Sequence, residues 1–152
     1  AVDSLVKADL KKAQAEVSKL QGDAADIYAD LAALRLAKAQ VDAGQAEAAI
    51  ATLRGLKPDA SLKSLVDLRL ARLLTDAGKG EEALKVLGDA SDSSSLEARG
   101  DALLATGKRD QARDIYLKAL TGMDVAAPQR RLVELKLTDA GGTPPKSGQP
   151  TR

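Results

Sequence analysis

Few side chains in this sequence could carry out chemistry. There is no His and no Cys, which excludes thiolate nucleophiles, imidazole bases and the metal sites that these residues build. A metal would need a site made only of carboxylates, and the closest acidic pair, Asp89 and Asp92, lies in a serine-rich loop where such residues usually cap helices. Paired carboxylates remain a formal route to general acid–base catalysis, but nothing in the pattern sets two of them in one pocket. We therefore expect neither enzyme activity nor a metal or cofactor.

Two glycine–lysine segments invite comparison with a phosphate-binding loop. That motif needs four residues between its glycines and Ser or Thr after the Lys, so that backbone N–H groups surround a phosphate. Gly100 and Gly107-Lys108 have six residues between the glycines, and Arg109 follows the Lys. Gly78-Lys79-Gly80 lies in a turn between two predicted helices. The sequence therefore does not predict a nucleotide site.

The composition is that of one helical domain without a strongly charged face. Of 152 residues, 44% are apolar, and the only aromatic residues are Tyr28 and Tyr116. A core of Leu, Ala, Val and Ile favours closely packed helices over a β-sandwich. The net charge of +1 argues against nucleic-acid binding, which needs a basic face and usually aromatic stacking platforms. No apolar run is longer than four residues, so no segment of this sequence is predicted to span a bilayer.

One segment of the sequence occurs twice. Residues 34–44 (LRLAKAQVDAG) and 68–78 (LRLARLLTDAG) are identical at seven of eleven positions, at an offset of 34. A third and more distant copy, 97–107 (EARGDALLATG), ends 29 residues after the second. A period of 34 residues is typical of a helix–turn–helix repeat in which each unit stacks on the next.

Apolar residues spaced three and four apart predict eight helices, most of them bounded by a capping residue, a glycine or a proline. Ser94 and Glu97 have the spacing of a capping box, and Pro128 is predicted to occupy a first-turn position. The tail from Gly141 is proline-rich and lacks aliphatic residues, so it is predicted to be disordered. The predicted domain is 1–140, the predicted tail is 141–152, and the predicted helices are about 4–21, 24–43, 45–56, 60–77, 81–88, 94–106, 109–121 and 128–138.

Small residues recur at matched distances from the three repeat glycines. Two helices of a hairpin approach to about 8–10 Å only where small side chains face each other. Each glycine is expected to end its first helix in a left-handed conformation. The small residues are Ala37, Ala71 and Gly100, seven residues before Gly44, Gly78 and Gly107, and Ala49, Ala83 and Ala112, five residues after them.

The terminal helices carry apolar residues that are predicted to pack on the repeats. A short amphipathic helix is marginally stable alone, and the ends of a helical stack need covering. The alternatives are contact of the lysine-rich first helix with anionic lipid and contact of the last helix with a second chain. The residues concerned are Leu5, Val6, Leu10, Ala13, Val17 and Leu20 in the first helix, and Leu132, Val133, Leu135 and Leu137 in the last.

The small–turn–small pattern with its 34-residue period resembles the tetratricopeptide repeat (TPR). Within that class, 28–44 (YADLAALRLAKAQVDAG), 65–87 and 98–120 resemble the periplasmic domain of the YfgM family, an ancillary subunit of the SecYEG translocon. The resemblance implies an all-α, TPR-like solenoid of about three helical hairpins, with an N-terminal helix and a C-terminal capping helix. The sequence departs from the general pattern because it lacks the large aromatic residue early in each first helix, and because Pro58 falls early.

The same resemblance implies where the protein works. Members of the family are held in the inner membrane by one N-terminal helix, with their repeats in the periplasm. They associate with the SecYEG translocon, with periplasmic folding factors such as the membrane-anchored PpiD, and with unfolded client segments. The chain begins at Ala1 rather than Met, so we expect an anchor helix upstream of these residues. The alternative is a generic TPR scaffold for another envelope or cytoplasmic complex.

In such repeats the first helix of each hairpin lines a concave groove, which the resemblance assigns to protein binding. The groove would offer an apolar floor and basic residues to an extended or helical segment that carries a carboxylate. The alternative is that the leucines pack against the chain's own termini and the charges are only solvated. The candidate residues are Leu31, Leu34, Lys38 and Val41 from the first repeat, Leu65, Leu68, Arg72 and Thr75 from the second, and Glu97, Asp101 and Leu104 from the third.

Overall fold

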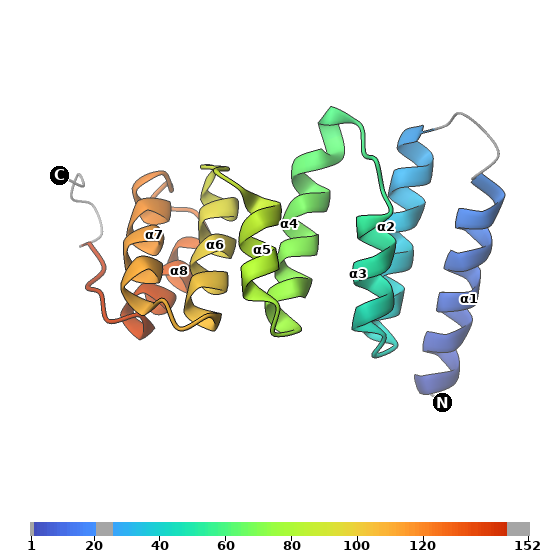
Figure 1. The fold of residues 1–152 in the computed structure, drawn as a ribbon, viewed down its shortest axis with the longest axis horizontal. Coiled ribbons are helices and arrows are strands. Elements are labelled where there is room, and N and C mark those ends of the chain that lie inside the picture. Colours follow the sequence, from blue (N-terminus) through green and yellow to red (C-terminus); the bar gives the residue numbers. More distant parts are fainter. Residues whose placement is uncertain (1, 21–25, 146–152) are drawn as a thin grey trace. The chain divides into compact units, whose positions relative to one another are not determined.

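The computed structural model describes residues 2–20 and 26–145, and within those ranges it contains eight helices and no strand (Figure 1). The predicted turn between the first two helices, 22–23, and the end of the predicted tail, 146–152, lie outside the described residues. The chain forms two compact units, which divide between Leu73 and Leu74. The helices are α1 (Val2–Leu20), α2 (Asp26–Asp42), α3 (Ala46–Arg54), α4 (Ala60–Asp76), α5 (Gly80–Leu87), α6 (Ser93–Ala105), α7 (Arg109–Thr121) and α8 (Arg130–Asp139).

The order of the helices confirms the predicted fold class. After α1, three pairs of helices are joined at the three repeat glycines, and α8 follows the last pair. Gly44, Gly78 and Gly107 have φ values of +76°, +79° and +79°, a left-handed conformation that a residue with a Cβ adopts only at a cost. The turns therefore form where the sequence predicts them.

In the first unit, α1 packs along α2. Leu10 and Ala13 of α1 are buried against Leu36 of α2, so the N-terminal helix docks on the repeats as predicted. Leu5 is 67% exposed, and the prediction that it belongs to the buried stripe is wrong. Among residues 3–17 of α1, Leu10 is the first that is buried, and Val6 one turn before it is only partly buried.

The α2–α3 hairpin of the first unit has the predicted small-residue positions in its interior. Ala37 and Ala49 are both buried. The Oγ1 of Thr52 on α3 donates a hydrogen bond to the Oε1 of buried Gln40 on α2, at 2.7 Å. Such a bond is needed because a buried amide without a partner destabilises the fold. One hydrogen bond therefore joins the two helices beside the closely packed alanines.

In the second unit, α6 and α7 approach closely at Gly100. A Cβ on Gly100 would lie 2.6 Å from Cδ1 of Tyr116 on α7, and closer still to Cε1. Glycine is therefore the only residue that leaves room for this ring, which is almost completely buried. The ring lies in a core cluster with Leu96 and Leu103 of α6, Ala112, Ala119 and Leu120 of α7, and Val133, Leu137 and Ala140 at the C-terminal end.

The capping box predicted at Ser94 and Glu97 is wrong. The N-cap of α6 is Asp92, whose side chain accepts a hydrogen bond from the Ser95 N–H at 3.1 Å. Hydrogen bonding with the side chain of Ser95, and then with backbone N–H groups, outweighs the effect of burial and lowers the pKa of Asp92 below its ordinary value of 3.8. A capping aspartate satisfies one of the free N–H groups of the first turn, and Glu97 is left to make a different contact.

The last helix begins two residues later than predicted, so Pro128 is not in its first turn. Its first residue is Arg130, which is buried. The Nη1 of Arg130 donates hydrogen bonds to the carbonyls of Leu120 and Met123, at 3.2 and 3.1 Å. Leu120 lies in the last turn of α7 and Met123 lies two residues after the helix ends, so Arg130 joins the C-terminal end of α7 to the start of α8.

Replacement of Gly100 by Ala tests the close approach of α6 and α7. Ala is normally more stable than Gly inside a helix by about 0.5–1 kcal/mol, but here its methyl group overlaps the buried Tyr116 ring. We expect Gly100→Ala to lower the free energy of unfolding by about 1–3 kcal/mol, measured by denaturant unfolding. In a Tyr116→Leu background the same change should be neutral or stabilising. An equal loss in both backgrounds would contradict the contact.

Candidate functional site

The candidate groove residues of α2 do not all reach the surface. Leu31 and Val41 are each 40% exposed, and Lys38 is also exposed. Leu34 is only 4% exposed, so it belongs to the core and is not available to a partner. Three of the four residues predicted on this helix are therefore surface residues.

The exposed side of α2 extends further toward its N-terminus than the sequence analysis predicted. Tyr28 is 69% exposed and Ile27 is 48% exposed. They precede Leu31 by three and four residues, and such residues are neighbours on a helix. The signal that could have found them is an aromatic residue one turn before a candidate site in a chain with only two aromatics. We define the α2 surface as Ile27, Tyr28, Leu31, Arg35, Lys38 and Val41, all of them exposed.

The candidate residues of the second repeat are divided between the two units. Leu65, Leu68 and Arg72 belong to the first unit, and Thr75 belongs to the second. Leu65 and Arg72 are exposed, whereas Leu68 and Thr75 are partly buried. The structure therefore describes surface positions on α4 of the first unit, and Thr75 is not part of them.

The candidate residues of the third repeat are engaged by α8. The Nζ of Lys136 on α8 donates to Oε1 of Glu97 at 2.7 Å and to Oδ2 of Asp101 at 2.9 Å. The other oxygen of Asp101 accepts a hydrogen bond from the Tyr116 hydroxyl at 2.6 Å, and Glu97 is only 4% exposed. Leu104 packs against the core cluster. In this repeat the chain's own C-terminal helix occupies the candidate positions.

The prediction for the α8 leucines is correct only in part. Val133 and Leu137 are buried in the core cluster, which agrees with capping of the last hairpin. Leu132 and Leu135 are exposed, so they do not contribute to that cap. The helix presents one apolar side to α7 and leaves two leucines on another side.

The hydrogen bonds that Lys136 and Tyr116 make with the carboxylates of α6 keep both groups protonated. Burial, the hydrogen bond to Asp101 and the neighbouring carboxylates raise the pKa of Tyr116 well above its ordinary value of 10.0. Burial acts to lower the pKa of Lys136, but its hydrogen bonds to Glu97 and Asp101 and their charges outweigh it, so this pKa lies above 10.5. Both groups keep their protons at neutral pH, and neither is suited to act as a general base there.

No metal or phosphate geometry is present in the part of the chain that the structure describes. Among residues 2–20 and 26–145, no group of three or more His, Cys, Asp or Glu side chains could hold a metal ion. Gly100 lies inside α6, and Lys108 forms an ion pair with Glu81 at 3.2 Å. No described helix is both long enough and apolar enough to cross a membrane.

Removal of the Lys136 charge should weaken the attachment of α8. Lys136→Met leaves the Glu97 carboxylate buried without its partner, which costs about 3–5 kcal/mol for a fully buried pair. Because Lys136 is partly exposed and screened, we expect a loss of about 2–3 kcal/mol in the free energy of unfolding. The added change Glu97→Leu removes the stranded charge and should recover part of the loss. No measurable loss in Lys136→Met would show that this network does not hold α8.

The raised pKa values of Tyr116 and Lys136 predict a pH dependence at alkaline pH. The folded chain holds both protons, and the unfolded chain releases them near 10.0 and 10.5. Their contribution to stability is therefore complete below pH 10 and falls as the pH rises above it. In a Tyr28→Phe variant, ultraviolet absorbance of the phenolate should report Tyr116 alone and appear only when circular dichroism shows unfolding. Phenolate formation in the folded state would contradict the burial of this hydroxyl.

Comparison with known proteins gives a family for this arrangement of helices. The sequence matches the family described as tetratricopeptide repeat-like domain over residues 1–142. A search of curated proteins found no match, and a search of solved structures found none either. The match covers the eight helices that the structure describes and nearly the whole chain. The chain therefore belongs to the tetratricopeptide repeat-like domain family.

Proposed function

We propose that this chain is a protein-interaction module without catalytic activity, and that it works in the periplasm as part of a membrane-anchored ancillary subunit of the Sec translocon. There it would help to pass emerging proteins to periplasmic folding factors. The observation that carries the proposal is membership of the TPR-like family over residues 1–142, whose domains generally bind other proteins. The resemblance of 28–44, 65–87 and 98–120 to the YfgM family supports the translocon role.

The α2 surface has the chemistry of a protein-binding surface. Ile27, Tyr28 and Leu31 place apolar area in water near the start of the helix, and a partner's apolar side chains would remove that area from water. Arg35 and Lys38 follow on the same side and are exposed. A partner segment with apolar residues next to an acidic residue fits both the apolar part and the basic part of the α2 surface. Its apolar residues contact the first part, and its carboxylate forms strong hydrogen bonds with the arginine or lysine of the second.

The size of this surface sets the strength of binding. Full burial of one large apolar side chain contributes about 1.5–3 kcal/mol, and these side chains are already partly covered. Association itself costs about 4–15 kcal/mol. A partner that used only the α2 surface would therefore bind weakly and leave quickly. Short-lived binding suits a protein that hands a client segment from one partner to the next.

Site-specific photo-crosslinking tests the proposal. A photoreactive residue replaces Lys38 on the α2 surface, Arg72 on α4 or, as a control, exposed Arg131 on α8. Each chain is mixed with purified SecYEG in lipid nanodiscs, or with a purified PpiD-like folding factor. We expect crosslinks to one or both components from Lys38 and Arg72, and none from Arg131. The absence of crosslinks to either component would contradict the translocon role and leave the generic scaffold.

Variants of the same surface test which residues bind. Tyr28→Glu and Leu31→Glu place a charge on exposed positions, so the fold should survive, and binding should weaken by about tenfold or more because an apolar contact becomes an unpaired charge. Leu135→Glu on α8 changes a similarly exposed leucine and should bind normally. If SecYEG or the PpiD-like factor binds the α2 variants as tightly as the unchanged chain, the α2 surface is not the binding site.

A further inference from the structure

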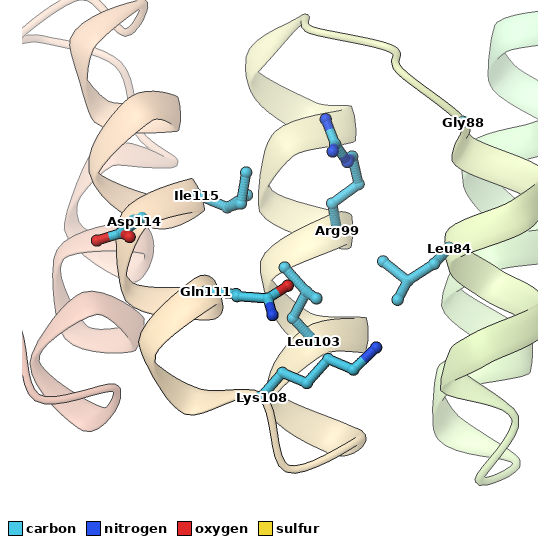
Figure 2. Close-up of a pocket in the computed structure, with 8 residues that line it drawn as sticks. All are labelled: Leu84, Gly88, Arg99, Leu103, Lys108, Gln111, Asp114 and Ile115. Carbon is cyan, nitrogen blue, oxygen red and sulfur yellow. The ribbon is translucent and has the colours of Figure 1, made fainter.

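The second unit contains a cavity that neither α8 nor any other described helix fills. It lies among α5, α6 and α7 (Figure 2) and has a volume of about 400 Å³. Cavities of about 300–1,000 Å³ are the usual size of sites for small ligands. This volume is therefore enough for one or two side chains of a partner.

The cavity opens on the side of α6 that faces away from α8. Its α6 residues are Arg99 and Leu103, whereas Lys136 of α8 binds Glu97 and Asp101. Residues two positions apart on an α-helix are rotated by about 200°, so the two pairs lie on nearly opposite sides. The helix that occupies the candidate groove positions of this repeat therefore leaves the cavity open.

The floor of the cavity is apolar. Leu103 of α6 lies between Leu84 of α5 and Ile115 of α7, and Figure 2 shows Leu84 directed toward α6. Leu84 and Ile115 are only partly buried against the core cluster. An aliphatic side chain that entered here would remove their remaining apolar area from water, which is favourable.

The rim of the cavity carries a positive charge that the structure does not neutralise. Arg99 is partly buried and forms no hydrogen bond or ion pair with another described residue. Lys108 reaches toward α5 in Figure 2, where its ion pair with exposed Glu81 is open to water. Asp114 points away from the cavity in Figure 2 and pairs with Arg113 at 3.5 Å. The charge that faces the opening is therefore basic.

We propose that this cavity is a second protein-binding site, which takes a short segment of a partner that has an aliphatic side chain next to a carboxylate. The aliphatic side chain lies on Leu84, Leu103 and Ile115. The carboxylate binds the guanidinium of Arg99, which can give two parallel hydrogen bonds to it. The only described aromatic residue of this unit, Tyr116, is buried, so the cavity has no platform for a nucleobase.

The test uses three pools of labelled hexapeptides on the immobilised chain, acetylated at the N-terminus and amidated at the C-terminus so that no terminal carboxylate is present. One pool contains Leu, Ala and Glu, and in two matched pools Gln or Lys replaces Glu. Mass spectrometry identifies the retained peptides, and fluorescence anisotropy measures their dissociation constants. We expect the chain to retain peptides of the Glu pool only. In NMR spectra of the chain, these peptides should change the amide chemical shifts of Arg99, Leu103 and Ile115. Retention of the Gln or Lys pool to the same extent, or no retention of any Glu peptide, overturns the proposal.

Variants at exposed or unpaired positions separate binding from folding. Arg99→Gln removes a charge that has no partner among the described residues, and it should weaken binding of the retained peptides by about tenfold, the value of one charged hydrogen bond. Gln111 is exposed and lies at the cavity in Figure 2, so it allows two substitutions of opposite charge. Gln111→Glu should weaken peptide binding by about threefold, and Gln111→Lys should strengthen it. Arg131→Gln on α8 is the matched control and should bind normally.

The peptide test of the cavity can be distinguished from the tests of the α2 surface and of the function proposed above. Tyr28→Glu and Leu31→Glu change the first unit, so they should leave peptide binding at the cavity unchanged. If these variants abolish peptide binding and Arg99→Gln does not, the peptides bind the α2 surface and the cavity is not a site.

Discussion

The contact on which the second unit depends is the one between Gly100 and the ring of Tyr116. A chain with two tyrosines and no Phe or Trp has few large side chains, so its helices must pack closely to exclude water. At Gly100 the missing side chain admits the ring, and the ring then presents its hydroxyl to Asp101. Asp101 also accepts from Lys136, which joins Glu97 to α8. One small residue thus permits the packing of α6 on α7 and, through a chain of hydrogen bonds, the attachment of the terminal helix.

The two units use their surfaces differently. In the first unit, α1 covers one side of α2 through Leu36, and the α2 surface stays exposed with apolar residues followed by basic ones. In the second unit, α8 engages the acidic positions of α6, and the cavity lies on the opposite side of that helix, lined by partly buried Arg99 and buried Leu103. Both open surfaces combine aliphatic area with unpaired or exposed basic groups. The two proposed sites therefore have similar chemistry, in a family whose domains generally bind proteins.

The hairpins could be predicted from the sequence because their determinants are local. The glycines at the turns and the small residues around them recur at fixed spacings, and Gly44, Gly78 and Gly107 adopt the expected backbone. The errors concern partners that are distant in sequence. Glu97 has the spacing of a capping residue, but Lys136, 39 positions away, binds it, and Asp92 is left to cap the helix. Leu34 has the same helical spacing as exposed Leu31 and Val41 but is buried, because tertiary packing, which periodicity does not encode, decides which side of a helix is covered. Arg130 likewise fixes the start of α8 through the carbonyls of Leu120 in α7 and of Met123 after it, and no local pattern predicts this.

The central claim is that the backbone of α6 meets the Tyr116 ring where a side chain is missing. A nuclear Overhauser spectrum of the folded chain measures this contact directly, because an Hα of Gly100 occupies the direction in which a Cβ would meet the ring. We predict strong cross-peaks from that proton to the δ and ε protons of Tyr116, together with a large upfield shift caused by the ring current. An Hα of Gly100 at an ordinary shift, with no cross-peak to the ring, would show that the two helices do not meet as described.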